Sequence, residues 1–391
     1  MAPQSVDLRL TVASCTPALV LSGGGARGAY QVGVLRQIAR RHPEFSFPII
    51  TGVSAGAINA AVIASHRGDL AEATEQLAQR WSTLTTSTVM RTDVPSLLGN
   101  ALRIAGAVAT GGARIAPTTR GLVDTMPLRG FLETLVKPQN IEANIRDGRL
   151  QALAVSATSY RTGDSITFVQ GSPDTAMWNR FRRQSRADRI GVDHILASAA
   201  IPLFFPAWQV EGEYFGDGSL RQPYPLAPAV HLGADRVLAV SSRFVSTAQA
   251  HAKEPGAYPS TARILGLMLN SIFLDQLDGD AERLERVNEL LQRVDPKQRW
   301  RLPEREVELL VLRPSRDIGR MAALYERKLP RALRHLVRGL GTRRGSGSDL
   351  LSYLLFVPEF LSDLIELGER DAEVNRARIS RFMEGCAPDG P

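Results

Sequence analysis

The stretch ALVLSGGGARG, residues 18–28, decides how the rest of this 391-residue chain is interpreted. It begins as a short apolar run typical of a buried strand, and its three glycines lead into a helical pattern. A second apolar run, residues 47–50, leads into GVSAG at residues 52–56. GVSAG fits the G-x-S-x-G nucleophile elbow, a sharp strand-to-helix turn that holds a serine hydroxyl clear of a sheet. The two stretches together predict acyl transfer by Ser54.

The glycine loop precedes the serine by one strand, where acyl transfer needs spare backbone N–H groups for an oxyanion. Gly23, Gly24 and Gly25 are the candidate donors. The loop also satisfies G-x-G-x-x-G, the dinucleotide-binding fingerprint. That fingerprint requires an acidic residue at the end of the next strand, but the next strand ends in the Ser54 turn. The pattern therefore favours an oxyanion hole, and we expect no cofactor and no metal.

A serine nucleophile also needs a base. A late histidine would complete a Ser-His-Asp triad, and His231 and His251 are the candidates, but one falls in an apparent helix and the other in a polar stretch. Asp217 stands between Gly216 and Gly218 at a predicted strand end, where glycines let the backbone approach another segment. Asp217 is the favoured base. A triad esterase and a catalytically silent, membrane-associated scaffold stay open as alternatives.

GGGARG, GVSAG and DGS, in this order and spacing, resemble the motifs of the patatin-like phospholipase family over roughly residues 17–232. The stretch ASAAIPLFFP, residues 197–206, is similar to that family's small-residue helix and aromatic loop. The resemblance implies a serine lipid acyl hydrolase, a phospholipase A, lysophospholipase or related esterase, with a Ser54–Asp217 dyad and Gly23–Gly25 as oxyanion donors. One difference is Ser219, where the family usually has glycine or alanine. The motifs are completed by Arg27, Gly28, Gly52, Gly56 and Gly218; the arginine could neutralise a lipid phosphate or fix the glycine loop.

Short apolar runs alternate with helical patterns, which predicts an α/β fold with a mainly parallel central sheet and helices on both faces, a three-layer α/β/α arrangement. We expect a tail over residues 1–16 and a catalytic domain over 17–250. A mostly helical C-terminal region over 251–391 is expected to pack on that domain or complete it. Within it, residues 262–294 read as a long helix with a break near Gly279, and 306–312 as one more strand. Residues 85–125 suit a mobile flap or an ordinary surface excursion.

The net charge of +7 comes almost entirely from arginine, which reflects either genomic composition or attraction to a phosphate-rich surface. We expect a membrane or micellar lipid as substrate, peripheral contact with an anionic membrane, and no nucleic-acid partner. No signal peptide or membrane-spanning run is recognised, which predicts a cytoplasmic protein. The apolar stretch 350–367 is expected to form a core or dimer helix rather than to insert, so a homodimer stays open. Candidates for contact with lipid are Phe204, Phe205, Trp208, Arg331, Arg334, Arg338, Arg343 and Arg344.

Overall fold

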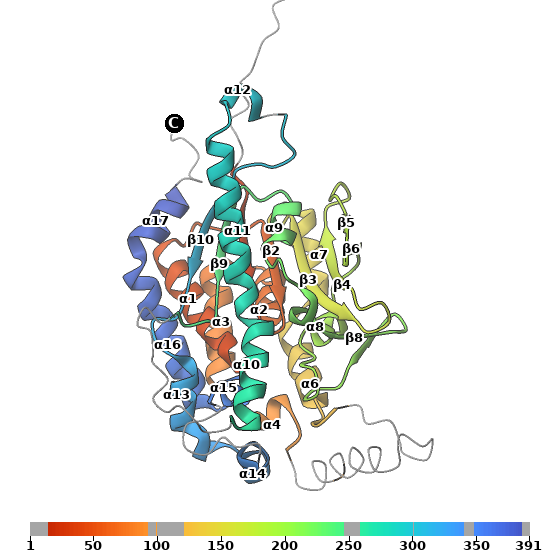
Figure 1. Cartoon of the computed structure of the whole chain (residues 1–391), viewed down its shortest axis with the longest axis vertical. Helices are drawn as coiled ribbons and strands as arrows, with labels where there is room; N and C mark the ends of the chain where they lie inside the picture. The colour runs from red at the N-terminus through yellow and green to blue at the C-terminus, as the bar shows by residue number, and fades with distance from the viewer. Residues whose placement is uncertain are drawn as a thin grey trace, which may run out of the picture.

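One mixed sheet organises the computed structural model, which describes residues 15–92, 99, 121–245, 259–299, 301–339 and 348–384 (Figure 1). Its strand order is β10-β9-β1-β2-β3-β4-β6-β5, and β8 pairs with β3 and β7. The ladders from β10 to β3 are all parallel, whereas β4 and β8 run antiparallel to β3. The strands are β1 (Pro17–Leu21), β2 (Ile49–Val53), β3 (Ala152–Ser159), β4 (Ser165–Gly171), β5 (Asn179–Arg180), β6 (Arg183–Ala187), β7 (Trp208–Val210), β8 (Glu213–Asp217), β9 (Arg236–Val240) and β10 (Glu308–Leu312).

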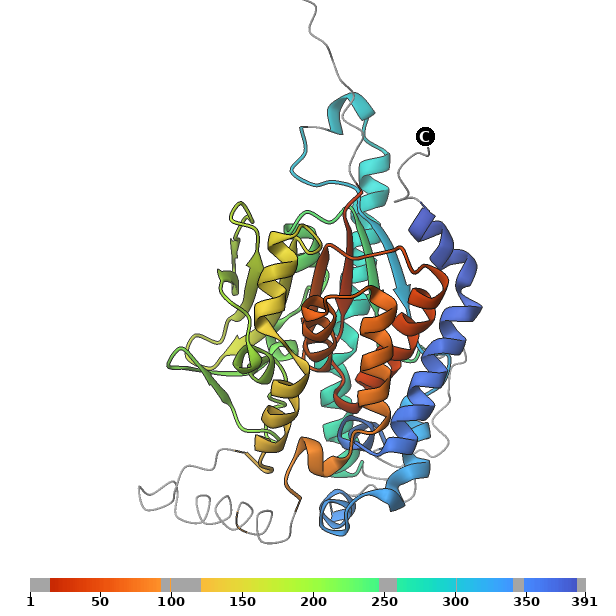
Figure 2. The ribbon, with the colours of Figure 1, turned by 180° about the vertical axis from the view of Figure 1, so that it is seen from behind.

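Helices cover both faces of this sheet, as predicted (Figures 1 and 2). Successive side chains of a strand point to opposite faces, so Leu19 and Leu21 of β1 join one apolar cluster and Ala18 and Val20 join another. The helices are α1 (Gly28–Arg41), α2 (Ala55–Ser65), α3 (Leu70–Ser82), α4 (Thr86–Val89), α6 (Met126–Leu135), α7 (Pro138–Arg146), α8 (Val192–Ser198), α9 (Ala227–His231), α10 (Thr261–Phe273), α11 (Asp275–Gln292), α12 (Pro296–Arg299), α13 (Ile318–Tyr325), α14 (Arg331–Gly339), α15 (Ser348–Leu354), α16 (Pro358–Val374) and α17 (Arg376–Glu384). Short 3-10 turns are η1 (Gly25–Arg27), η2 (Gly218–Arg221) and η3 (Glu326–Lys328).

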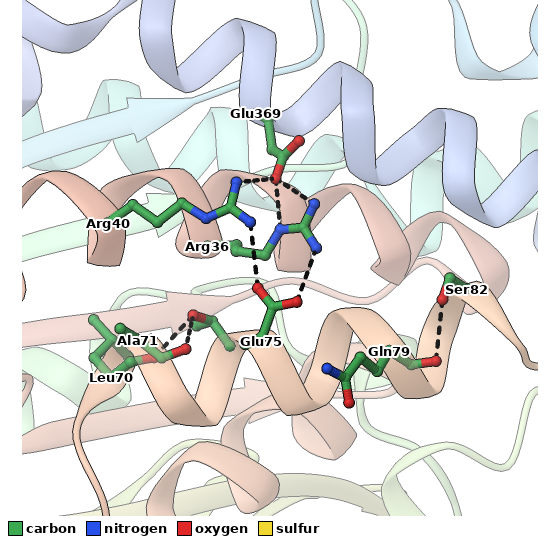
Figure 3. A network of polar contacts seen from close by, with 9 residues as sticks. Arg36, Arg40, Leu70, Ala71, Glu75, Gln79, Ser82 and Glu369 are labelled. Carbon is green, nitrogen blue, oxygen red and sulfur yellow. Dashed lines mark hydrogen bonds and ion pairs between the residues drawn. The ribbon is translucent and has the colours of Figure 1, made fainter.

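The C-terminal part of the chain is built into the sheet and its helical cover. Strand β10 pairs with β9 and extends the parallel part of the sheet. Helix α16 packs along α1 at close range, since a β-carbon on Gly33 would collide with the Ile365 carbonyl oxygen. Charges reinforce the contact: Glu369 of α16 accepts from Arg36 at 2.5 Å and from Arg40 at 3.2 Å, and both arginines also pair with Glu75 of α3 (Figure 3).

The apolar stretch 350–367 lies inside the protein. Leu350, Leu354, Phe360 and Leu364 are all fully or almost fully buried in the larger apolar cluster. The sequence interpretation of a core helix therefore agrees with the packing, and membrane insertion of this stretch does not. Across the described part of the chain, no helix combines the length and the apolar character needed to cross a bilayer.

One helix boundary differs from the sequence interpretation. The break expected near Gly279 falls at Leu274, between α10 and α11, and Gly279 lies within α11. Asp275 and Asp278 occupy the first turn of α11, where carboxylates are favoured by the helix dipole, so they mark a new helix start. Apart from the adjacent backbone of α11, no atom of the described residues lies within 4 Å of the place where a Gly279 β-carbon would stand, so this open helix face tolerates glycine.

The expected flap over residues 85–125 falls mostly outside the described residues. At its two ends the structure has α4 and the beginning of the segment that leads into α6. An isolated antiparallel bridge joins Arg91 to Asp124, so the ends of this stretch lie side by side. The short pair β5 and β6 was not anticipated, because its residues are mostly polar and carry no apolar alternation.

Candidate active site

Ser54 occupies the tight turn between β2 and α2, at the carboxyl edge of the parallel strands. Its φ of 56° is rare for a residue with a side chain, and such strain is characteristic of functional turns. The turn depends on close backbone contact: a β-carbon on Gly56 would collide with the Leu21 carbonyl oxygen, and one on Gly52 with that of Gly56. The sharp strand-to-helix turn predicted at Ser54 is therefore present.

A hydroxyl that the sequence analysis did not single out holds this turn. The Ser54 backbone N–H donates to Ser198 Oγ at 3.0 Å, and Ser198 Oγ donates to the Ser156 carbonyl at 2.6 Å. Ser198 is the last residue of α8 and Ser156 belongs to β3, so one hydroxyl ties the elbow to two other elements. Its only sequence signal was its place in the small-residue stretch 197–206.

Asp217 reaches the same place through strand register. Strand β3 pairs with β2 as far as Ser156 opposite Val53, and from Ala157 onward it pairs with β8, with Asp217 opposite Ala157. Asp217 therefore lies where β2 stops and the Ser54 turn begins. The next residue, Gly218, fits only without a side chain, since a β-carbon there would collide with the Ser156 carbonyl oxygen.

The Asp217 carboxylate is fully buried. Its Oδ1 accepts from the Ser219 backbone N–H at 2.9 Å, and its Oδ2 has no regular hydrogen-bond partner within the described part of the chain. Burial raises the pKa of Asp217 to about 7, while hydrogen bonding from the Ser54 hydroxyl and from Ser219 opposes the rise. A carboxyl with this pKa can exchange a proton near neutral pH.

The glycine loop follows β1 and lies beside Ser54. A β-carbon on Gly23 would stand 3.2 Å from the Ser54 β-carbon and 2.7 Å from Ser219 Oγ. Gly24 and Gly25 have φ values of 152° and 56°, which favour glycine. Among the described residues, the backbone N–H groups of Gly23, Gly24 and Gly25 have no acceptor. The loop thus carries three backbone N–H groups without acceptors, and Gly23 and Gly25 lie beside Ser54.

The Arg27 side chain contacts residues of helix α15. Its guanidinium is buried, donates from Nε to Ser352 Oγ at 2.7 Å and pairs with Asp349 at 3.1 Å. It also lies over the Tyr353 ring, 4.6 Å from the centroid. Of the two interpretations of this arginine, fixing the glycine loop agrees with these contacts. The neighbouring Gly28 packs against Ala55 and Trp81.

An apolar pocket lies at Ser54, with a cavity volume of about 30 Å³ in this structure. Phe205 lines this pocket and, like Phe204, is buried. The expectation that these two rings enter a lipid interface is therefore wrong, because they pack inward. Trp208 is half-buried and donates to Asp193. The lining residues are Gly25, Ser54, Ala55, Ile58, Arg80, Trp81, Leu84, Val89, Leu128, Phe131, Leu135, Ala199, Ile201, Phe205 and Phe356.

The histidine alternatives lie elsewhere. His231 is in α9, which leads into the amino end of β9, whereas Ser54 follows the carboxyl end of β2 in the same parallel sheet. The two residues are therefore on opposite edges of the sheet, and the His231 ring stacks on Trp178 at 4.9 Å. His251 lies outside the described residues. The described part of the chain contains no group of three or more metal-ligating side chains.

A serine held on a strained turn at the carboxyl edge of a parallel sheet is the arrangement of the α/β serine hydrolases. Within that class, the chain belongs to the patatin-like phospholipase family, whose model matches residues 19–230. The matched region begins in β1, ends in α9 and includes Gly23, Ser54 and Asp217. Members of this family are ester-hydrolysing enzymes, as its name states.

Relatives and solved structures give a wider setting. Uncharacterized NTE family proteins of Mycobacterium bovis and Mycobacterium tuberculosis are 28% identical over 254 residues, which cover 65% of this chain and 56% of each relative. The match therefore spans little more than half the length of these relatives. Human GIVD cytosolic phospholipase A2, solved with methyl gamma-linolenyl fluorophosphonate, aligns at 13% identity and a TM-score of 0.43, covering 95% of this chain and 59% of that one. VipD from Legionella pneumophila aligns at 11% identity and 0.36, covering 95% and 67%.

Proposed function

We propose that the protein is a lipid acyl hydrolase that works through a Ser54–Asp217 dyad. The observation that carries this proposal is the juxtaposition of a serine on a strained elbow, a buried carboxylate with a raised pKa, and three glycine N–H groups without acceptors. The apolar lining of the pocket at the serine suits the hydrocarbon chain of such a substrate. Family membership supports the same chemistry.

The proposed reaction has two steps. Ser54 Oγ attacks the ester carbonyl carbon while Asp217 accepts the hydroxyl proton, and the carbonyl oxygen becomes an oxyanion held by the N–H groups of Gly23, Gly24 and Gly25. The carbon–oxygen bond to the alcohol then breaks, and the alcohol leaves with the proton from Asp217. Water, deprotonated by Asp217, attacks the acyl-serine ester, which releases the fatty acid and restores Ser54 Oγ–H.

Product analysis tests this function directly. A panel of phospholipids, lysophospholipids and neutral acyl esters is incubated with the protein, and released fatty acids are identified by mass spectrometry. We expect release by the wild type and none by Ser54→Ala. A fluorophosphonate probe should label Ser54 covalently. Absence of both hydrolysis and labelling would instead favour a silent scaffold.

The pH dependence follows from the state of the base. Asp217 must be ionised to accept the serine proton, and its pKa is raised to about 7. We therefore expect kcat/KM on a p-nitrophenyl acyl ester to rise with pH and reach half its plateau near pH 7. His231→Ala and His251→Ala should leave this profile unchanged. Loss of the rising limb in either histidine variant would support a triad esterase.

The pocket predicts a dependence on acyl length. Ile58, on α2 one turn beyond Ser54, lines the pocket and is only partly buried. Ile58→Trp adds volume there, so we expect kcat/KM for long-chain p-nitrophenyl esters to fall about tenfold relative to short-chain esters. Ile63→Trp is the matched control, because Ile63 is on the same helix but lines a separate pocket with Phe45 and Leu70. An equal shift in both variants would argue against the acyl assignment.

Contact with a lipid surface is proposed at the end of the molecule that carries α14, α4 and the beginning of α10 (Figures 1 and 2). Ile264, Leu267 and Met268 of α10 are exposed and share one side of the helix by their spacing. The last residue of α10, Phe273, contacts the glycine loop, residues 23–25, which is called the oxyanion loop from here on. Its ring lies 2.9 Å from the β-carbon position of Gly23. Arg331 and Arg334 of α14 can add attraction to anionic lipid, about 1 kcal/mol each. Arg338 is paired with Glu326 at 2.5 Å, and Arg343 and Arg344 lie outside the described residues.

Vesicle pelleting tests this surface. Leu267→Asp/Met268→Asp should weaken binding and slow hydrolysis of vesicle lipid, yet leave kcat/KM for a soluble ester within twofold. Val374→Asp is the control, since Val374 is 83% exposed but lies at the far end of α16. Binding that does not change with the fraction of anionic lipid would contradict the electrostatic part of the proposal.

A further inference from the structure

The oxyanion loop is in contact with a helix from far along the sequence. Helix α15 lies against η1, and a β-carbon on Gly25 would collide with the Tyr353 carbonyl oxygen. Arg27, two residues after Gly25, makes its hydrogen bonds and ion pair with Ser352 and Asp349 of the same helix. Helix α15 lies outside residues 19–230, the part matched by the family model.

The charge on Arg27 makes these contacts energetically important. A buried guanidinium is costly unless it is paired and hydrogen-bonded, and the partners of Arg27 among the described residues all come from α15. Ser352 is itself held, because its Oγ donates to the Asp349 carbonyl at 2.6 Å. Removing Asp349 or Ser352 therefore leaves a buried charge underpaired directly beside Gly25.

Helix α15 is anchored on its other side as well. The Tyr353 hydroxyl donates to Asn270 Oδ1 of α10 at 2.9 Å, and its ring packs against Phe273 at 5.5 Å between centroids. Phe273 in turn lies next to Gly23. The oxyanion loop is thus enclosed by two elements from beyond residue 260, one at Gly25 and Arg27 and one at Gly23.

We propose that Asp349 and Ser352 are positioning residues for catalysis, which act through Arg27 to fix the Gly24–Gly25 backbone with its N–H groups aimed at the oxyanion. The inference rests on the proposed hydrolase function. Stabilisation by an oxyanion hole depends on donors placed before the reaction, and a displacement of about 1 Å costs about 100-fold in rate. The C-terminal segment is therefore part of the catalytic apparatus and not only of the scaffold.

Kinetics on a soluble p-nitrophenyl ester test the proposal. We expect Asp349→Ala and Ser352→Ala to lower kcat about 10- to 100-fold with KM changed less than threefold, because the loop acts on the transition state. Asp349→Glu keeps the negative charge. We expect its log kcat to recover at least a third of the difference between Asp349→Ala and the wild type. A purely structural role would lower the melting temperature and leave kcat of the folded enzyme unchanged.

Glu369→Gln is the matched control. It removes the ion pairs of Glu369 with Arg36 and Arg40 (Figure 3). Like the Arg27 contacts, these pairs join the C-terminal region to the part of the chain that follows the oxyanion loop, but they lie along α1 and not at the loop itself. It should lower the melting temperature without changing kcat. Wild-type kcat retained in Asp349→Ala and in Ser352→Ala, or an equal loss in Glu369→Gln, would overturn the proposal. A wild type without esterase activity or fluorophosphonate labelling would instead overturn the proposed function.

Discussion

Ser54→Ala is expected to lower kcat for a lipid or p-nitrophenyl acyl ester by about 10⁴-fold or more. The reason is that the reaction loses the atom that forms the covalent bond, and the oxyanion donors alone give only residual catalysis. Covalent labelling by a fluorophosphonate should disappear in the same variant. Initial rates with purified protein and mass spectrometry of the labelled peptide measure both effects.

Ser65→Ala is the appropriate control for this experiment. Ser65 is also buried and is the last residue of α2, the helix that Ser54 precedes; within the described part of the chain its hydroxyl donates to the Val62 carbonyl, a full helix length from the elbow. It should retain wild-type kcat and labelling. Appreciable turnover in Ser54→Ala that is absent from mock purifications would mean that another residue is the nucleophile.

Asp217→Asn is expected to lower kcat by about 10²- to 10⁴-fold. The amide keeps the size of the carboxyl group and can still accept the Ser219 N–H through its oxygen, but it cannot take a proton from Ser54. The rise of kcat/KM with pH near 7 should vanish with it. Activity of Asp217→Asn within threefold of wild type would remove Asp217 from the mechanism.

The same substitution should change stability in a pH-dependent way. The folded-state pKa of Asp217 is raised to about 7, above its unfolded value of about 4, so the folded state binds more protons and loses stability as pH rises between those values. The loss amounts to about 4 kcal/mol and is complete above pH 7. We therefore expect Asp217→Asn to be more stable than wild type at pH 8 and not at pH 4, as measured by urea unfolding.

Asp280→Asn is the control that distinguishes an effect on stability from an effect on catalysis in Asp217→Asn. Asp280 is also a buried carboxyl whose pKa burial raises, to about 6, and it accepts the Leu226 backbone N–H from a site in α11. Its substitution should alter the pH dependence of stability while leaving kcat unchanged. A fall of kcat in this variant comparable to that in Asp217→Asn would show that unfolding, and not loss of a base, explains the rates.

Local sequence patterns were sufficient to predict much of the fold and, within the candidate site, the positions of the glycine loop and Ser54. The apolar runs before Gly23 and Ser54 predicted two adjacent strands, and the turn chemistry at each end predicted where backbone donors and the serine would lie. Local pattern alone could not predict that Asp217 lies beside Ser54, because this position depends on how β3 changes partner from β2 to β8. Flanking glycines and the family resemblance pointed to it, but spacing alone did not.

The contacts that hold the site together left no local signal. Ser198 and Asp349 look like ordinary polar residues in their own segments, and their partners are 144 and 322 residues away. The predicted helix break near Gly279 differs from the observed break at Leu274 because two local signals compete. Glycine disfavours a helix interior and so predicts a break near Gly279, whereas the carboxylates of a first turn mark where the new helix begins.

The packing of α16 on α1 also has a consequence for the order of events during synthesis. Helix α1 follows the glycine loop directly, yet the backbone that Gly33 touches is at Ile365. On the ribosome, which adds about 5–20 residues each second, α1 therefore stays without its α16 partner until Ile365 has been added. A nascent chain consequently carries an unpaired apolar face on α1 until the residues of α16 have been synthesised.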